Sequence, residues 1–360
     1  MHLTYLVSAD YIRTTGGWIY NERMLRELAA IGWQITRIEL GPGFPDPAPD
    51  VTAGAARVIA GLPGGTLVLA DQIVLSPLAD VLPAAAARLR FAMLMHHPQV
   101  LESSRPPAVA ARMDRQERAA LGKMECVIAT SRLTGAQLIA DYGVDSGRLF
   151  IAEPGTDLLQ ASPGSGGPGV HLFSLGSVIA RKRHELIVGA LAGLMDLDWR
   201  LTIAGALDMN DAQVAKLRQL IGAVGLADRI ALSGALSGPD LEAIWQTTDL
   251  YVASSVHEGF GMAVAEAIAR RIPVVTTRSG AVGGWIDPRA SVLVEPDDTA
   301  TMRAVLRRVL SQPELLKALR EGTVLARSAL VTWPQSARIV GNALSAPPGD
   351  IALRLPARLC

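Results

Sequence analysis

The sequence predicts an α/β protein of two domains, each built on a parallel β-sheet with helices on its faces. The chain has 360 residues, whereas a single hydrophobic core stops growing at roughly 250–300 residues. Hydrophobic residues make up 49% of the chain and aromatic residues only 4%, so the core is mostly aliphatic, as in buried parallel strands. Short apolar runs alternate with helix-length amphipathic segments from end to end, which is the pattern of βαβ units.

The first half of the chain is expected to form one such sheet. The predicted strands are the apolar runs 3–8, 34–40, 66–71, 90–95, 126–130 and 149–153. The predicted helices include 21–31 and 107–123. The Gly-, Pro- and Ser-rich segment 160–169 then predicts a flexible linker, so the first domain is expected to contain residues 1–159.

The alternation restarts after the linker and predicts a second domain over residues 170–333. Its strands are expected at 170–175, 199–204, 230–233, 249–253, 273–276 and 291–294. Its helices are expected at 183–194, 211–223, 239–247, 262–270 and 299–310, and one more helix at 333–345. Ligands of open parallel sheets bind beyond the carboxyl ends of the strands, so we expect a ligand in a cleft between the two domains.

Composition excludes several classes of protein. Lys plus Arg and Asp plus Glu both number 34, and a net charge of zero argues against a nucleic acid partner. The two cysteines, Cys126 and Cys360, predict neither a disulfide framework nor a zinc site. No signal peptide and no transmembrane segment is recognised, so we expect a cytoplasmic protein, with peripheral membrane contact left open.

Two glycines, Gly16 and Gly17, lie between the first predicted strand and the helix 21–31. A glycine pair lets backbone N–H groups approach an anion at a helix N-terminus. The alternative is a tight strand-to-helix turn. No G-x-G-x-x-G follows this strand, so a nicotinamide dinucleotide site is not expected.

Two histidines, His96 and His97, follow the predicted strand 90–95, at the edge where catalytic groups collect in such folds. A histidine there can bind a substrate hydroxyl or stabilise charge, and the alternative is a capped turn. Neighbours on an extended chain point in opposite directions, so the pair is not expected to bind one metal ion. We expect one of the two to be functional.

A basic run, Arg181 to His184, follows the first strand of the second domain. Arg181 and Lys182 could neutralise a diphosphate, both when it is bound and when it leaves. The alternative is a solvated basic turn.

The motif with the strongest chemical content runs from Glu258 to Glu266, after the predicted strand 249–253. Gly259 and Gly261 flank Phe260, and a helix is expected to begin near Met262, so backbone N–H groups would face a phosphate or a sugar oxygen. The two carboxylates could bracket a ligand, because a carboxylate accepts hydrogen bonds from neighbouring sugar hydroxyls. The alternative is that Glu266 is only an acid favoured near a helix N-terminus.

These residues resemble a known family. Glu258-Gly259-Phe260-Gly261-Met262 through Glu266 is similar to the E-x7-E signature of the retaining glycosyltransferases of family four, which have the GT-B architecture of two Rossmann-like domains. The likeness covers nearly the whole chain and is looser in the first half, which binds the acceptor in that family. One departure concerns Gly176-Ser177, where the family usually has Gly-Arg, so Arg181 is expected to substitute for the missing cation.

The resemblance also implies roles for single residues. His96 and Glu258 would be catalytic, and His96 fits better than His97 because it comes first after the strand. The donor would be bound by Gly16, Gly17, Arg181, Lys182, Gly259, Phe260, Gly261, Met262 and Glu266. Glu266 would bind the ribose hydroxyls, and the last helix would return to the first domain with residues 334–360.

The resemblance therefore implies a retaining hexosyltransferase that uses a nucleotide-diphosphate sugar, with UDP-sugar favoured and GDP-sugar next, and an unidentified acceptor. No cofactor and no metal would be needed. Two alternatives stay open at this point: a sugar-nucleotide epimerase of the same architecture, and a non-catalytic nucleotide-sugar-binding protein.

Overall fold

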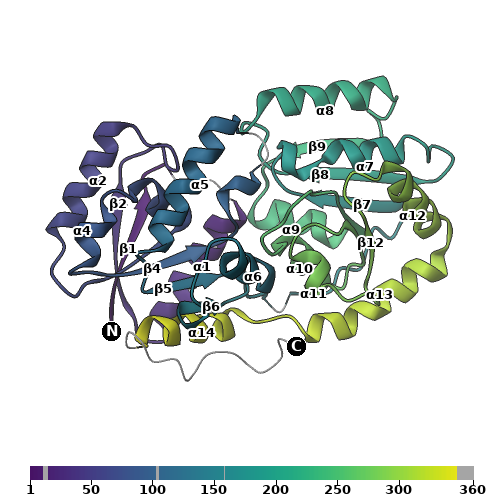
Figure 1. Ribbon diagram of the computed structural model, residues 1–360. Helices are drawn as coiled ribbons and strands as arrows, with labels where there is room; N and C mark the ends of the chain where they lie inside the picture. Colours follow the sequence, from purple (N-terminus) through teal and green to yellow (C-terminus); the bar gives the residue numbers. More distant parts are fainter. Residues whose placement is uncertain (11–14, 103–104, 158, 347–360) are drawn as a thin grey trace. The chain divides into compact units, whose positions relative to one another are not determined.

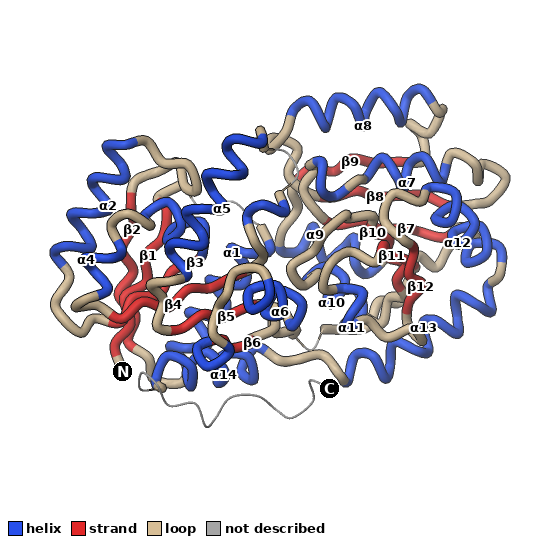
Figure 2. The backbone as a smooth tube through the Cα atoms, in the orientation of Figure 1, coloured by secondary structure: helices blue, strands red, loops and turns tan. Residues whose placement is uncertain are grey.

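The computed structural model describes residues 1–10, 15–102, 105–157 and 159–346, and it divides into two compact units (Figure 1). The first unit contains Met1–Gly155 and the chain from Val331 onward, and the second contains Thr156–Leu330. Of the two cysteines, Cys126 is buried in the first unit, and Cys360 lies outside the described residues. In each unit the strands form an inner layer with helices around it (Figure 2).

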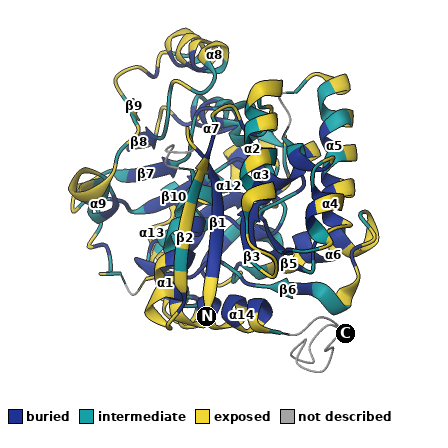
Figure 3. Ribbon diagram, turned by 90° about the vertical axis from the view of Figure 1, so that its left-hand side faces the viewer, coloured by how far each residue is buried: buried dark blue, intermediate teal, exposed yellow. Residues whose placement is uncertain are grey.

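The first unit has a six-stranded parallel sheet in the order β2-β1-β3-β4-β5-β6. The strands are β1 (His2–Ser8), β2 (Gln34–Leu40), β3 (Leu67–Asp71), β4 (Arg90–Met95), β5 (Cys126–Ala129) and β6 (Leu149–Ile151). The helices are α1 (Gly16–Ala30), α2 (Pro49–Gly61), α3 (Gln72–Leu75), α4 (Leu82–Ala86), α5 (Pro107–Leu121), α6 (Arg132–Ala140) and α14 (Trp333–Ser345), with short 3₁₀ turns η1 (Ser76–Leu78), η2 (Gln99–Leu101) and η3 (Ser146–Arg148). β1 is buried from Leu3 to Ser8, whereas the edge strand β2 is largely exposed (Figure 3).

The second unit has a six-stranded parallel sheet in the order β12-β11-β10-β7-β8-β9. The strands are β7 (Val170–Leu175), β8 (Trp199–Ala204), β9 (Ile230–Gly234), β10 (Leu250–Ala253), β11 (Val274–Thr277) and β12 (Ser291–Val294). The helices are α7 (His184–Leu191), α8 (Asp211–Ala223), α9 (Gly238–Gln246), α10 (Met262–Ala269), α11 (Val282–Trp285), α12 (Thr299–Ser311) and α13 (Pro313–Ser328), with the 3₁₀ turn η4 (Ala180–Lys182). This order makes β7 and β10 neighbours, although 74 residues separate Leu175 from Leu250.

Every predicted strand overlaps an observed one. Most of these strands are buried, as apolar runs in a parallel sheet are, and the exceptions are the edge strands β2 and β9. The helix predicted at 21–31 begins earlier, at Gly16, since the Thr15 hydroxyl accepts the Trp18 N–H at 3.3 Å and caps the helix. Gly16 and Gly17 therefore form the first turn of α1 and not a loop before it.

The last helix completes the first unit. α14 packs against α1 and against β5 and β6. Gly155, after β6, lies so close to α14 that a Cβ atom on it would be 2.2 Å from the Trp333 backbone nitrogen. Only glycine fits this approach.

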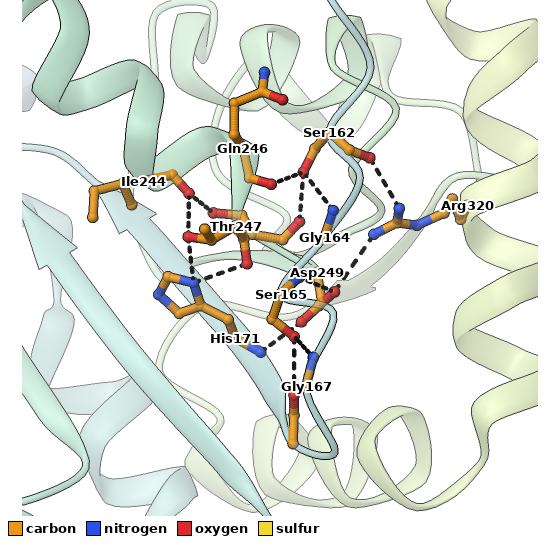
Figure 4. A network of polar contacts seen from close by, with 12 residues as sticks. Ser162, Gly164, Ser165, Gly167, His171, Ile244, Gln246, Thr247, Asp249 and Arg320 are labelled. Carbon is orange, nitrogen blue, oxygen red and sulfur yellow. Dashed lines mark hydrogen bonds and ion pairs between the residues drawn. The ribbon is translucent and has the colours of Figure 1, made fainter.

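The segment 160–169 is not the flexible linker that its composition suggested. It belongs to the second unit, where the Asp249 carboxylate accepts the Ser165 N–H at 3.0 Å and Arg320 donates to the Ser162 carbonyl at 3.1 Å (Figure 4). Ser162 itself is 4% exposed. The backbone polar groups of the segment find partners far away in the sequence, on Asp249 just before β10 and on Arg320 of α13.

Candidate active site

The carboxyl ends of β7 and β10 hold most of the residues predicted to bind the donor. Because the two strands are neighbours, the segments that follow them meet. The Val256 N–H donates to the Arg181 carbonyl at 2.9 Å, and the Ser254 hydroxyl lies 2.8 Å from the Lys182 carbonyl. These contacts hold the basic turn η4 beside the loop that carries Glu258.

Glu258 is the centre of this cluster. Its Oε1 atom accepts hydrogen bonds from Lys182 Nζ at 2.6 Å and from the Ser255 hydroxyl at 2.5 Å, and it lies 3.6 Å from an Arg181 guanidinium nitrogen. The side chain is 15% exposed. All three contacts go to Oε1, and Oε2 has no hydrogen-bond partner among the residues that the structure describes. One carboxylate oxygen is thus fixed by the protein, and the other is available to a ligand.

The Glu258 carboxylate is held ionised. Burial opposes its charge, but the positive charges of Lys182 and Arg181, with the hydrogen bonds from Lys182 and Ser255, outweigh burial and lower its pKa to about 2. At neutral pH it is therefore an anion that can only accept hydrogen bonds.

The N-terminus of α10 follows directly. Gly261, with φ of 94°, turns the chain into the helix, and a Cβ atom there would lie 2.5 Å from Val282 Cγ2. No side chain caps this helix within the described part of the chain. The backbone from Gly259 to Met262 can therefore face an anion. The Phe260 side chain cannot, because it is 8% exposed and stacks on Trp285 at 5.0 Å.

Glu266 lies one turn further along α10. Its carboxylate is 3.7 Å from a guanidinium nitrogen of Arg270, which also pairs with Glu242 at 2.7 Å. Burial, with the nearby charges of Asp157 and Glu242, raises the pKa of Glu266, although Arg270 opposes the rise. The side chain remains 30% exposed, so it can still reach a ligand.

The histidines and the glycine pair belong to the first unit. The His96 ring nitrogen Nε2 lies 3.1 Å from Asn21 Oδ1, and the edge of the ring meets Tyr20 with the centroids 5.4 Å apart. Burial and the neighbouring His97 lower the pKa of His96 to about 3, so the ring is neutral at pH 7. His97 points elsewhere and pairs with Glu102 at 2.9 Å.

Sequence reasoning missed three residues of these clusters. Ser255 holds Glu258, and Asn21 and Asp71 form a hydrogen-bonded pair next to His96. Asp71 could have been noticed, because it ends a predicted strand at the ligand-binding edge of its sheet. Asn21 lies within a predicted helix and carries no local signal.

Among the residues that the structure describes, no group of three or more His, Cys, Asp or Glu side chains is placed to hold a metal ion. In the same residues, no helix is long and apolar enough to cross a membrane.

Comparison with known proteins finds a family model that matches part of the chain, and solved structures with the same fold. Residues 159–323 match the family model of the glycosyl transferases group 1. The chain is 30% identical over 229 residues to D-inositol 3-phosphate glycosyltransferase of Arthrobacter sp. (strain FB24). This match covers 59% of this chain and 54% of that relative, so the chain spans about half of the relative's length. It is 25% identical over 308 residues to MMP alpha-(1->4)-mannosyltransferase of Mycolicibacterium hassiacum, covering 81% of this chain and 73% of that relative.

Among solved structures, the sucrose-phosphate synthase of Thermosynechococcus elongatus aligns with a TM-score of 0.79 at 19% identity, over 95% of this chain and 98% of that one. At this identity the likeness shows the fold alone, and it confirms the predicted GT-B architecture. The role of each site residue stays a prediction.

Proposed function

We propose that the protein is a glycosyltransferase, because residues 159–323 match the family model of the glycosyl transferases group 1 and the chain has the GT-B fold. It transfers a hexosyl group from a nucleotide-diphosphate sugar to an acceptor, with retention of the anomeric configuration. The donor is a UDP-sugar in the first instance and a GDP-sugar in the second. The reaction needs no metal and takes place in the cytoplasm.

The observation that carries this proposal is the cluster of Glu258, Lys182 and Arg181 at the carboxyl edge of the second sheet. The free Oε2 of Glu258 is suited to accept hydrogen bonds from sugar hydroxyls. The two cations beside it are suited to bind a diphosphate and to stabilise it as a leaving group. A site that puts an acceptor for hydroxyls next to cations for phosphate matches the two halves of a nucleotide-sugar.

The other predicted residues complete the assignment. The backbone of Gly259 to Met262, at the N-terminus of α10, binds donor oxygens, and Glu266 binds the ribose hydroxyls. From the first unit, Gly16 and Gly17 at the N-terminus of α1 bind the diphosphate. His96, neutral at pH 7, binds a hydroxyl of the reacting sugar.

In the transfer step the bond between the sugar C1 and the diphosphate oxygen breaks, and the acceptor oxygen forms a bond to C1 on the same face. The acceptor proton passes to the departing phosphate. Lys182 and Arg181 stabilise the negative charge that develops on the diphosphate. No protein nucleophile takes part in this step.

The test begins with donor binding. Thermal melting is measured with UDP-, GDP-, ADP- and dTDP-sugars, with and without EDTA. A ligand at about 100 times its dissociation constant adds about 2.7 kcal/mol, enough to raise the melting temperature by a few degrees. We expect a selective shift that EDTA does not change. The absence of any shift with every sugar nucleotide would contradict the proposal.

Variants then test the site. Lys182→Ala should weaken donor binding at least tenfold, because a cation next to the diphosphate is lost. Glu258→Ala should abolish release of nucleotide in the presence of an acceptor while the protein remains folded. The matched control is Lys216→Ala. Lys216 is 65% exposed, and its ion pair with Glu185 is long, at 3.9 Å. Equal donor affinity of Lys182→Ala and Lys216→Ala would refute the assignment.

A further inference from the structure

The buried carboxylate of Asp71 begins a chain of hydrogen bonds in the first unit. Asp71 is 1% exposed at the end of β3, where Oδ1 accepts the Val74 N–H at 3.3 Å and caps α3. Its other oxygen, Oδ2, lies 2.9 Å from the Asn21 side-chain amide, which is also 1% exposed. A carboxylate only accepts hydrogen bonds, so Asn21 must present its NH₂ group to Asp71.

This orientation decides what His96 can do. With Nδ2 facing Asp71, the carbonyl Oδ1 of Asn21 faces His96 Nε2 at 3.1 Å. A carbonyl oxygen only accepts, so Nε2 must carry the proton and donate it. In a neutral imidazole the second nitrogen, Nδ1, then holds a lone pair. Nδ1 has no hydrogen-bond partner among the described residues.

The rest of the histidine is fixed as well. The His96 N–H donates to Gln72 Oε1 at 3.3 Å, and the His96 carbonyl accepts from the Thr130 hydroxyl at 3.2 Å. Tyr20 meets the ring nearly at right angles, with an interplanar angle of 85°. Backbone, ring plane and Nε2 are all held, and Nδ1 is the one ring nitrogen left to a ligand.

We propose that Asn21, oriented by Asp71, is a positioning residue that fixes the Nε2–H tautomer of His96 and leaves Nδ1 as an acceptor for a ligand hydroxyl. The identification of that hydroxyl as one of the donor sugar rests on the proposed function, whereas the tautomer does not. His96 then acts as a neutral hydrogen-bond acceptor and not as a charged acid. Its low pKa, about 3, agrees with this role.

The experiment reads the tautomer directly. The full chain is labelled with ¹⁵N-histidine, and long-range ¹H–¹⁵N spectra are recorded at pH 7 without any donor. The six histidines are resolved, and His96 is assigned by the signal that disappears in His96→Gln. We expect a protonated Nε2 and an unprotonated Nδ1 in the wild type. A charged ring or the Nδ1–H tautomer would overturn the proposal by itself, whether or not any variant folds.

Asp71→Asn is the decisive variant, because it keeps the shape of the side chain. An amide at position 71 can offer its own NH₂ group to Asn21, which lets Asn21 turn its NH₂ group toward His96. We expect the signal to move from a single tautomer to a mixture containing Nδ1–H. Glu102→Gln is the control, since it changes the partner of His97 and should leave His96 unaltered.

Turnover separates this inference from the proposed function. Asp71→Asn should lower kcat with little change in the KM for the donor, because an acceptor in the site is lost in part of the molecules. An unchanged tautomer in folded Asp71→Asn would overturn the positioning role. The expected tautomers without any transferase activity would instead contradict the proposed function and leave the positioning intact.

Discussion

Replacing Glu258 with glutamine keeps the size of the side chain and removes its charge. The site stabilises that charge strongly: the pKa of Glu258 falls from its ordinary 4.5 to about 2, because Lys182 and Arg181 outweigh the cost of burial. A difference of about 2.5 pKa units corresponds to about 3 kcal/mol of folding free energy. We expect Glu258→Gln to be less stable than the wild type by about this amount at pH 7.

The pH dependence follows from the direction of the shift. A carboxyl group whose pKa is lowered by folding stabilises the protein fully above its unfolded pKa of 4.5, and this contribution is lost as the pH falls toward 2. The glutamine variant has no such contribution to lose. The gap in stability between wild type and variant should therefore shrink by about 1 kcal/mol between pH 7 and pH 4.

Urea unfolding of both proteins at pH 7 and pH 4 measures the difference in their free energy of unfolding at each pH. Glu295→Gln is the control, because Glu295 is 66% exposed and pairs with Arg278 at 2.8 Å. An exposed pair of this kind contributes about 0–1 kcal/mol, so its loss should matter little. A Glu258→Gln variant as stable as Glu295→Gln at pH 7, or a gap that grows toward pH 4, would refute the reasoning.

Two further variants test the packing and the anchored segment. Gly155→Ala should destabilise the first unit by about 2 kcal/mol or more, because the added methyl group meets the Trp333 backbone. The control is Gly54→Ala in α2, where a Cβ atom meets nothing within 4 Å, and this variant should be as stable as the wild type or more stable. Asp249→Asn should cost about 1–3 kcal/mol in urea unfolding, since an amide cannot accept from both backbone N–H groups that Asp249 binds. Asp196→Asn, at an exposed ion pair, is its control and should change the free energy of unfolding little. If a variant and its control lose the same stability, the contact proposed for that variant does not stabilise the protein.

The sequence predicted the strands well because a buried parallel strand is a local signal. Residues 159–323 match the family model of the glycosyl transferases group 1, and the finer assignment to the retaining enzymes of family four stays a prediction. The sequence does not show which strands lie next to each other in a sheet. The contact of Lys182 with Glu258 depends on β7 lying beside β10, and nothing local specifies that order.

The same limit explains the two clearest differences. Composition suggested a linker at 160–169, but the Asp249 side chain that binds it lies about 80 residues away in the chain. Asn21 lies in α1, Asp71 ends β3 and His96 follows β4, so the three residues meet only after folding. Motif reasoning finds a functional residue at the end of a strand, but it does not find the neighbours that fix its protonation.

Glu117 is a buried carboxylate that the proposed chemistry does not use, and it predicts a distinct pH response. It is fully buried on α5, where it accepts the Gln99 backbone N–H at 3.1 Å and lies 3.4 Å from the Gln99 side-chain amide. Burial, with the charge of Asp114, raises its pKa from 4.5 to about 7, although the Gln99 hydrogen bonds and Arg105 oppose the rise.

A carboxyl group with a raised pKa costs stability as the pH rises from its unfolded toward its folded pKa, so the wild type should lose about 3 kcal/mol through Glu117 between pH 4.5 and 8. Glu117→Gln should remove this loss. The Gln99 side chain can turn over to accept from the new amide, which would also satisfy its buried Oε1, an atom without a partner in the described residues. In urea unfolding at pH 5 and pH 8, the free energy of unfolding of the variant should therefore rise relative to that of the wild type as the pH rises. Glu39→Gln is the control, because Glu39 is 64% exposed. A variant that is less stable than the wild type at pH 8 would mean that the Glu117 side chain is ionised and well compensated in the folded protein, and that burial does not govern its charge.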